Sequence, residues 1–426
     1  MISRCHSKSQ VQREYSESQG KPWLSCVSWE QRKVSEVTKF HKQGFYTTEE
    51  YGDDKKYYLL RGTDLAENKL ILNDTPKINA TDKDYQAFKT EVGDFLIVRS
   101  GTVGTYGIVY DDIPAIFGSY LIDFRFDMGQ VSNEFFGYFY QSELFKKQLN
   151  QIIQRSANTN INAENIKSTS IMFPSLDEQK KISDYLIYID HLITLHQHKY
   201  DKLLNIKKSM LEKMFPRDGS KFPEIRFSGF TDPWEQRKLN SLCEKFSDGD
   251  WIESKDQSTK GIRLVQTGNV GITEFLDKPD NKKWISEDTF KQLNCKEIYA
   301  GDILISRLPE PAGRACIVPK INEIMITAVD CTIARISKEY SNKFLVQYLS
   351  SSKYFEKVNT FLAGGTRQRI SRSILGEFEV LIPKIKKEQE LIGNFFGELD
   401  TLITLHQRKL EKLKNIKKSV LEKMFV

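Results

Sequence analysis

Apolar residues recur at spacings of three and four along residues 178–215 and again along 388–425. In the first segment they are Ile182, Tyr185, Ile189, Leu192, Leu203, Ile206 and Met210, and in the second Ile392, Phe395, Leu399, Leu402, Leu413, Ile416 and Val420. This stripe is typical of an amphipathic helix. Neither segment contains proline, and acidic residues at its start and lysines near its end suit the helix dipole. We therefore expect two helices about 57 Å long.

The two helical segments are copies of one another. Residues 178–215 align without gaps with residues 388–425, with 23 identities in 38 positions. Weaker matches precede them: Gly-Asp-x-Leu-Ile-x-Arg at 93–99 recurs at 301–307, and Trp-Glu-Gln-Arg-Lys at 29–33 recurs at 234–238. Because the matches keep their order along the chain, the sequence indicates a tandem duplication.

Each long helix presents the same apolar stripe, so the other copy is its obvious partner, and we expect an antiparallel coiled coil. The predicted seam positions are Leu192, His196, Leu203, Leu402, His406 and Leu413. His196 and His406 fall where the seam turns polar. No nucleophile or carboxylate repeats beside them, so we interpret them as a packing pair that fixes the register and not as catalytic groups.

The remaining sequence mixes short strands and helices. Apolar runs at 95–98, 115–117 and 120–126 predict strands, as do their counterparts at 303–305, 316–318, 324–329 and 332–336. Residues 133–153 and 342–362 each predict a single amphipathic helix. The expected fold class is α+β, with an internal pseudo-two-fold repeat. Its expected parts are an atypical N-terminal extension at 1–28, α/β domains at 29–173 and 217–382, and long helices at 174–216 and 383–426.

Composition limits the class of protein. The chain has 426 residues, 39% hydrophobic and 28% charged, which can support several packed domains. No run reaches the roughly 18 apolar residues of a membrane-spanning helix, and the first thirty residues lack the apolar segment of a secretory signal. We expect a cytoplasmic protein. The net charge of +6 lies in the two helical segments, so charge alone does not indicate a nucleic-acid partner.

Signatures of catalysis and metal binding are missing from the sequence. The six cysteines show no Cys-x-x-Cys pair, and His196-x-His198 has no further ligand at a useful spacing. Gly20-Lys21 lacks the earlier glycine of a phosphate-binding loop, and no Asn-Pro-Pro or Asp-Pro-Pro tetrad of an amino-methyltransferase occurs. The glycines of residues 101–107 lie between predicted strands, which favours a connecting turn. We expect a non-catalytic chain that binds no cofactor.

Several motifs together resemble a known family. They are Phe-Pro-Glu-Ile-Arg-Phe-x-Gly-Phe at 222–230, the two Gly-Asp-x-Leu-Ile motifs, Gly-Gly-Thr-Arg-Gln-Arg-Ile at 364–370, and Pro-x-x-x-Glu-Gln-x-x-Ile at 174–182. In these the chain resembles the DNA-specificity subunit of type I restriction-modification systems. Residues 1–28 depart from the family pattern, because they lack the Phe-Pro-x-x-Arg-Phe lead-in of the second half.

The resemblance implies two target-recognition domains, each of which reads one half of a split DNA site, with the helices as a spacer. The implied partners are double-stranded DNA, two modification (methyltransferase) subunits, and restriction (translocase/nuclease) subunits. S-adenosylmethionine and ATP are then expected on those partner subunits. Because the two domains differ in sequence, the site should be asymmetric.

Polar and basic loop residues are the candidates for base reading, since arginine pairs with guanine and asparagine with adenine. They are Arg99, Ser100, Thr102, Arg155, Asn158, Asn160, Arg307, Arg314, Thr366, Arg367 and Arg369. The alternative is that these loops only solvate the domain surface.

Two other functions remain open at this point. One is a scaffold or regulator whose domains bind proteins. Insensitivity of its DNA binding to salt would favour that function, because phosphate contacts make affinity salt-dependent. The other, a self-contained restriction enzyme, is disfavoured by the missing catalytic motifs.

Overall fold

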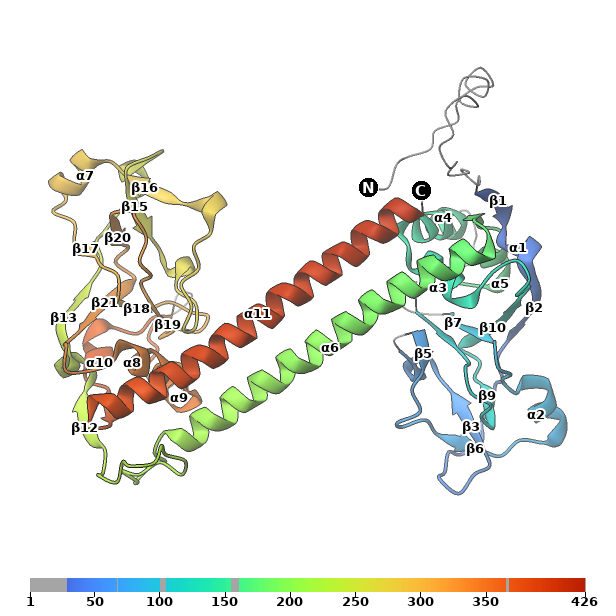
Figure 1. The fold of residues 1–426 in the computed structure, drawn as a ribbon, viewed down its shortest axis with the longest axis horizontal. Helices are drawn as coiled ribbons and strands as arrows, with labels where there is room; N and C mark the ends of the chain where they lie inside the picture. The colour runs from blue at the N-terminus through green and yellow to red at the C-terminus, as the bar shows by residue number, and fades with distance from the viewer. Residues whose placement is uncertain (1–28, 67, 100–104, 155–160, 365–367, 426) are drawn as a thin grey trace, which may run out of the picture. The chain divides into compact units, whose positions relative to one another are not determined.

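A computed structural model describes residues 29–66, 68–99, 105–154, 161–364 and 368–425. The described chain forms two compact units, the first from residues 29–195 and 411–425 and the second from residues 196–410. Two helices of 39 residues each, α6 (Leu176–Met214) and α11 (Lys386–Met424), contribute to both units (green and red in Figure 1). Within the described residues, none of the helices combines the length and apolar character needed to cross a bilayer.

The first unit contains short strands and helices before α6. They are β1 (Glu30–Lys33), α1 (Val34–Val37), β2 (Thr38–Gln43), β3 (Tyr57–Leu60), η2 (Gly62–Asp64), β4 (Leu65–Ala66), β5 (Asn68–Leu70), β6 (Lys77–Ile78), α2 (Asp82–Phe88), β7 (Phe95–Val98), β8 (Tyr106–Ile108), β9 (Ala115–Phe117), β10 (Leu121–Phe126), α3 (Asn133–Gln141), α4 (Glu143–Gln154), α5 (Ala163–Lys167) and β11 (Ser170–Phe173).

The second unit repeats much of this order between α6 and α11. Its elements are β12 (Glu235–Lys238), η3 (Leu239–Leu242), β13 (Cys243–Asp248), η4 (Ser254–Asp256), β14 (Gln257–Ser258), β15 (Ile262–Val265), η5 (Thr267–Asn269), η6 (Pro279–Asn281), β16 (Lys283–Ile285), α7 (Glu287–Gln292), β17 (Glu297–Ile298), β18 (Ile303–Ser306), β19 (Ala315–Ile317), β20 (Met325–Thr327), β21 (Cys331–Ile336), α8 (Asn342–Tyr348), α9 (Ser352–Thr360), α10 (Arg372–Gly376) and β22 (Glu379–Ile382).

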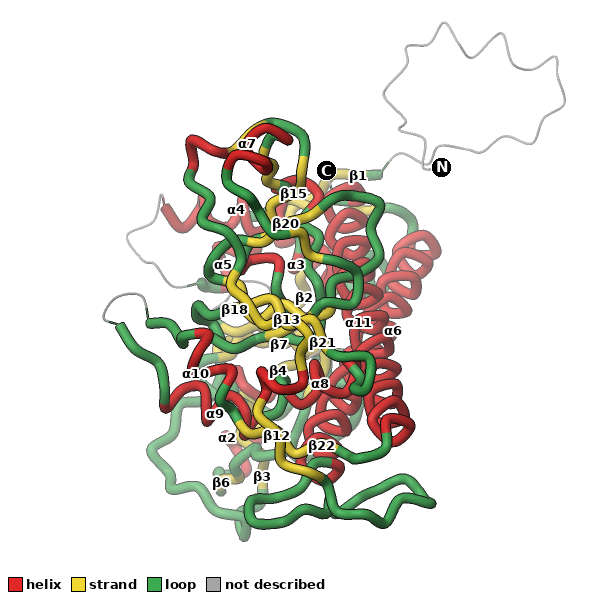
Figure 2. The backbone as a smooth tube through the Cα atoms, turned by 90° about the vertical axis from the view of Figure 1, so that its left-hand side faces the viewer, coloured by secondary structure: helices red, strands yellow, loops and turns green. Residues whose placement is uncertain are grey.

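The same antiparallel sheet lies in each unit. Strands follow the order β2-β10-β7-β8 in the first unit and β13-β21-β18-β19 in the second, where Figure 2 shows β13, β18 and β21 as neighbours. The first sheet continues with β5 and β4. The other sheets are β6-β3-β9 and β14-β16-β15-β20-β17, and the pairs β1-β11 and β12-β22 lie next to the start of each long helix. The mixed α/β character and the predicted strands are confirmed.

The prediction of single helices at 133–153 and 342–362 was wrong, because a serine divides each of them. Ser142 has an extended backbone (φ −69°, ψ 154°), and its Oγ accepts a hydrogen bond from Phe145 N–H at 3.2 Å. Ser351 is likewise extended, and its Oγ accepts from Tyr354 N–H at 3.3 Å. Each serine caps the second helix, and this capping bond replaces a helical one. The resulting pairs are α3–α4 and α8–α9.

Both long helices enter the core of each unit. In the first unit, Leu186 of α6 and Phe425, just after α11, are buried with Phe135 and Phe139, and the Phe425 ring centroid lies 5.4 Å from that of Phe135. In the second unit Phe215, just after α6, has its ring centroid 5.4 Å from that of Phe344 and 6.0 Å from that of Phe396 on α11. Each core is therefore completed by the beginning of one long helix and the end of the other.

The buried stripe of α11 differs by one residue from the predicted seam. Leu402 is 44% exposed, whereas Ile403 is 9% exposed and continues the spacing from Leu399 to Leu410. The placement of Leu402 in the seam was wrong, since two adjacent apolar residues fit the pattern equally well. The other predicted apolar seam residues, Leu192, Leu203 and Leu413, are half-buried.

His196 and His406 contact one another across the two helices. Their Nδ1 atoms lie 2.8 Å apart, so one ring donates to the other. Burial lowers the pKa of both rings, and nearby Lys199 and Lys409 lower it further. This contact agrees with the interpretation of the two histidines as a packing pair, and their role in fixing the register stays a prediction.

A buried carboxyl group distinguishes the first sheet from the second. Asp123 on β10 is fully buried, whereas Ile333 occupies the corresponding place on β21. Burial above all, and then the nearby carboxylate of Asp94, raises the pKa of Asp123 to about 8, although Arg125, 3.5 Å away, acts in the opposite direction. Asp123 therefore keeps its proton in the folded protein at pH values where the unfolded chain releases it.

Asp123→Asn should remove a pH-dependent loss of stability. For a raised pKa, the free energy of unfolding falls as pH increases from about 4 to about 8. We expect the variant to exceed the wild type by about 1–3 kcal/mol at pH 8 and by much less at pH 5. Urea denaturation at both pH values measures this, with the exposed Asp53→Asn as control. An unchanged pH slope would contradict the assignment.

Candidate nucleic-acid interface

The strand register of the second unit brings several loops to one edge of its sheet. Ser306, the last residue of β18, pairs with Cys331, and Asp248 at the end of β13 pairs with Thr332. The backbone N–H of Ile370 donates to the carbonyl of Arg307 at 3.2 Å. We call this the second loop edge. It comprises Asp248–Trp251, Arg307–Arg314, Asp330, and the segment around Ala363 and Arg369.

The first unit has an equivalent edge. Val98, which ends β7, pairs with Leu121, and Gln43, which ends β2, pairs with Ile122. The N–H of Ile161 donates to the carbonyl of Arg99 at 3.3 Å, as Ile370 does to Arg307. We call this the first loop edge. It comprises Gly44–Tyr46, Arg99, Tyr120 and Ile161.

The segments 100–104 and 155–160 are joined to the first loop edge at Arg99 and Ile161. The predicted residues Ser100, Thr102, Arg155, Asn158 and Asn160 belong to these segments and lie outside the described residues. Arg99 itself is half-buried, and its N–H donates to the carbonyl of Tyr120 at 2.9 Å. Base reading by this set stays a prediction.

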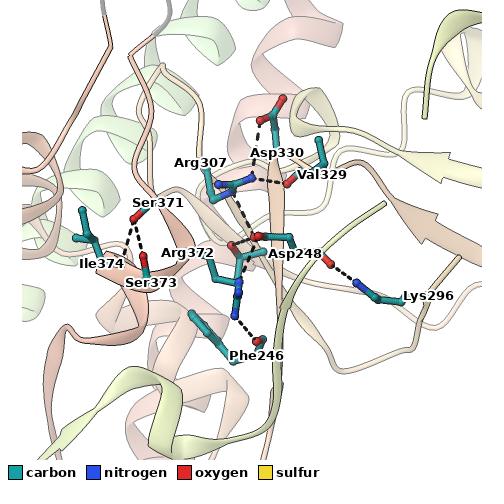
Figure 3. A network of polar contacts seen from close by, with 11 residues as sticks. Phe246, Asp248, Lys296, Arg307, Val329, Asp330, Ser371, Arg372, Ser373 and Ile374 are labelled. Carbon is teal, nitrogen blue, oxygen red and sulfur yellow. Dashed lines mark hydrogen bonds and ion pairs between the residues drawn. The ribbon is translucent and has the colours of Figure 1, made fainter. Parts of the chain in front are cut away.

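Arg307 supports the second loop edge from inside. Its guanidinium is 8% exposed, donates from Nη2 to the Val329 carbonyl at 2.6 Å, and lies near two carboxylates (Figure 3). The distances are 3.6 Å from Nε to Asp248 and 3.9 Å from Nη2 to Asp330. A buried guanidinium held by its own chain cannot pair with a base without losing these bonds. Arg307 is therefore a structural residue, contrary to our prediction.

Arg314 is also committed to its own chain. Its guanidinium donates to four backbone carbonyls, those of Thr267, Val270, Leu308 and Pro311, at 2.7–2.9 Å. Burial lowers the pKa of this side chain from its usual value. These bonds tie the loop after β18 to the turn after β15, so the prediction of base reading by Arg314 is corrected as well.

Arg369 remains a candidate for DNA contact. Its backbone pairs with Ala363 in both directions, at 2.8 and 3.1 Å, and its side chain is exposed. The predicted Thr366 and Arg367 lie between these paired residues but outside the described part of the chain. The short hairpin therefore presents at least one exposed arginine at the second loop edge.

Two further basic residues lie at the second loop edge and were not predicted. Arg372, 43% exposed, contacts Asp248 with Nε at 3.2 Å and the Phe246 carbonyl with Nη1 at 3.1 Å (Figure 3). Lys296 donates its N–H to Asp250 at 2.7 Å, and its side chain extends towards the carbonyl of Asp248. Arg372 continues the run of arginines at 367 and 369, but no sequence pattern indicated Lys296.

The first turn of each long helix is bonded to its unit by the same side chains. Glu178 accepts from the Trp29 indole at 3.3 Å, and Glu388 accepts from that of Trp234 at 3.2 Å. The following residue, Gln179 or Gln389, accepts from the backbone N–H that precedes α3 or α8, at 2.9 and 2.8 Å. These residues are identical in the two sequence copies, which was the signal that could have identified them.

Comparisons with known proteins agree with this arrangement. A family model described as the type I restriction modification DNA specificity domain matches residues 27–205 and 231–415. The chain belongs to this family. The Methanocaldococcus jannaschii type I restriction enzyme MjaVIII specificity subunit is 24% identical over 265 residues, 61% of each chain, and the MjaX specificity subunit is 22% identical over 411 residues, 92% of each chain.

The fold is also that of a specificity subunit. The crystal structure of the type I restriction-modification S subunit from M. genitalium matches with a TM-score of 0.60 and 16% sequence identity, over 95% of this chain and 98% of that one. The two matches to the specificity-domain model each include one loop edge.

Ion pairs between α6 and α11 recur in both units of this specificity-family chain. In the first unit Lys417 contacts Asp190 at 2.6 Å, and Asp190 also accepts from the Tyr138 hydroxyl at 2.9 Å. In the second, Lys207 contacts Asp400, which also accepts from the Gln347 amide at 2.8 Å. Both lysines and both aspartates are identical in the repeat, so sequence alone could have singled them out.

Arg314→Ala and Arg369→Ala should distinguish an arginine that stabilises the second loop edge from one that is available to contact DNA. We expect Arg314→Ala to lower the free energy of unfolding by about 2–4 kcal/mol, because it removes four hydrogen bonds that tie the loop after β18 to itself and to the turn after β15. Arg369→Ala should change it by less than about 0.5 kcal/mol, since the side chain is exposed. Urea denaturation of the full chain checks both. Equal stability of the two variants would refute the supporting role of Arg314.

Proposed function

We propose that the chain is the sequence-specific DNA-binding subunit of a type I restriction-modification complex, and that each unit reads one half of a bipartite asymmetric site. The observation that carries the proposal is the convergence of the predicted loops at one equivalent edge in each unit. An edge that gathers strand ends and exposed basic groups can bring phosphate contacts and base-reading side chains to one stretch of duplex.

Differences between the edges support an asymmetric site. The scaffold is shared: Ile161 and Ile370 bond to Arg99 and Arg307 in the same way. The side chains presented are not shared, because Tyr120 stands in the first unit where Asp330 stands in the second. Two edges with one backbone plan and different side chains should read different bases.

We further propose that α6 and α11 form an antiparallel coiled coil that sets the gap between the half-sites. In the second unit, the residue numbers on α6 increase from His196 to Lys207 while those of their partners on α11 decrease from His406 to Asp400. The two helices therefore run in opposite directions there. In the first unit, Lys417 and Asp190 exchange the roles of Lys207 and Asp400. Such an exchange is what an approximate two-fold axis between the halves would produce.

The proposed chain has no catalytic role of its own. It would bring two modification subunits, and restriction subunits where present, to the DNA that its edges recognise. S-adenosylmethionine and ATP would then bind the partner subunits and supply methylation and translocation. The repeated surfaces of the long helices are suited to carry two identical modification subunits.

Changing Arg367 and Arg369 to alanine together should impair only one half-site. If they pair with bases, removing each pairing weakens binding by about 1–3 kcal/mol at the base concerned, and the other half-site is unaffected. Mapping methylated adenines in cells that carry the variant and its modification subunit measures this. We expect the methylated sites to lose base preference in one half and to keep it in the other. A uniform reduction at all sites would show that these arginines bind phosphate and do not read bases.

A matched deletion in both long helices tests the spacer. Removing residues 195–201 and 405–411 takes two turns from each helix and shortens it by about 10 Å while the seam stays in phase. The deletion removes the His196–His406 contact, and the two Lys–Asp pairs that remain hold the helices in register. We expect the same half-sites at a gap shorter by about three base pairs.

The control deletes residues 195–201 from α6 and leaves α11 at full length. The Lys–Asp partners on the two helices then no longer face one another, so this variant should lose site-specific methylation. New bases recognised at the old gap by the matched variant would overturn the spacer role.

A further inference from the structure

Tyr46 and Trp251 occupy equivalent places at the two loop edges. Each stands two residues after the glycine that follows a sheet strand, Gly44 after β2 and Gly249 after β13. The N–H of Gly44 donates to Leu121 and that of Gly249 to Cys331, at 3.0 and 2.9 Å. Tyr46 is 76% exposed and Trp251 is 69% exposed. Both units thus present a large aromatic ring to solvent at the same point.

The backbone explains why these rings are exposed. A Cβ at Gly44 would lie 2.1 Å from the Gly118 carbonyl oxygen, and one at Gly249 would lie 2.3 Å from that of Thr327. Glycine therefore lets the strand end run close to the neighbouring loop. The next residue is half-buried in both units, as for Phe45, whose ring lies 5.2 Å from that of Phe88. Alternation along extended backbone then directs Tyr46 and Trp251 outwards.

Basic residues belong to both loop edges. Trp251 adjoins Asp250, which accepts from the backbone N–H of Lys296, and Asp248 contacts the guanidinium of Arg372. Tyr46 lies on the edge that holds Arg99 and a second exposed ring, Tyr120, which is 69% exposed. Glu253 accepts from the indole N–H of Trp251 at 3.3 Å and is paired with Lys255 at 2.9 Å. That bond engages the N–H edge of an indole that stays largely exposed.

We propose that Tyr46 and Trp251 are DNA-contacting residues whose ring faces pack against nucleotides of the half-site read by their own unit. The inference rests on the proposed function and names side chains that the sequence did not indicate. Single exposed aromatic residues are common, but these two hold one position in two edges that differ at other presented side chains, such as Tyr120 and Asp330. Aromatic rings bind bases and sugars through apolar contact that tolerates sequence change, so they add affinity and can open a base step while neighbouring arginines choose bases.

The test measures binding of the full chain, together with its modification subunit, to a duplex that carries both mapped half-sites. Trp251→Ala should weaken binding at least about fivefold, and Trp251→Phe should retain most of the affinity. The slope of affinity against salt should not change, because a neutral ring releases no counterions. Tyr46→Ala should act in the same way. Phe222→Ala, which removes another aromatic ring that is 53% exposed, is the matched control and should have no effect.

A second measurement uses iodide quenching of tryptophan fluorescence. Iodide should quench one part of the wild-type fluorescence that is missing from Trp251→Phe. Bound duplex should protect that same part from iodide in the wild type. The inference would be overturned if both alanine variants bound the duplex with wild-type affinity, or if the duplex did not protect Trp251 from iodide. The proposed function would still stand in that case, provided that the Arg367/Arg369 variant binds more weakly than the wild type. A wild-type complex that prefers no DNA sequence would refute the proposed function, and the inference with it.

Discussion

Each unit depends on a helix end that the chain supplies from far away in sequence. Phe425 packs with Phe135 and Phe139, which precede it by 290 and 286 residues, and Phe215 packs with Phe344 and Phe396. A fully buried phenylalanine contributes about 1.5–3 kcal/mol. Neither core is complete without both long helices. Any role of the helices in spacing is therefore combined with a role in folding, and a change in one helix affects both units.

In the proposed function, one scaffold carries two specificities. Some hydrogen bonds stabilise the edge itself, such as the four from the Arg314 guanidinium to backbone carbonyls. N–H groups that make such bonds are not available to bases. Side chains that face outwards, such as those of Arg369 and Trp251, contribute little to the fold, so the fold itself does not constrain them. The separation of these two sets allows the presented side chains to diverge between the units while the sheet and its register stay the same.

Sequence reasoning predicted the repeat, the long helices and most strands, because these depend on periodicity and local composition. It could not distinguish Leu402 from Ile403, since both are apolar and adjacent, nor the breaks at Ser142 and Ser351, where a side-chain cap competes with a helical bond. For the site it named loops that the structure brings to one edge of each sheet, and it counted Arg307 and Arg314 among the base readers although both bond to carbonyls of their own chain. Whether an arginine bonds to carbonyls of its own chain depends on tertiary contacts, which one sequence does not reveal.

The central claim is that two different edges on one repeated scaffold recognise one split site. Selection from a library of random duplexes by the wild-type chain with its modification subunit tests it most directly. The account predicts two short blocks of preferred bases, unlike one another and separated by a degenerate gap of one fixed length. A single continuous block, a palindrome, or two blocks at variable spacing would contradict it.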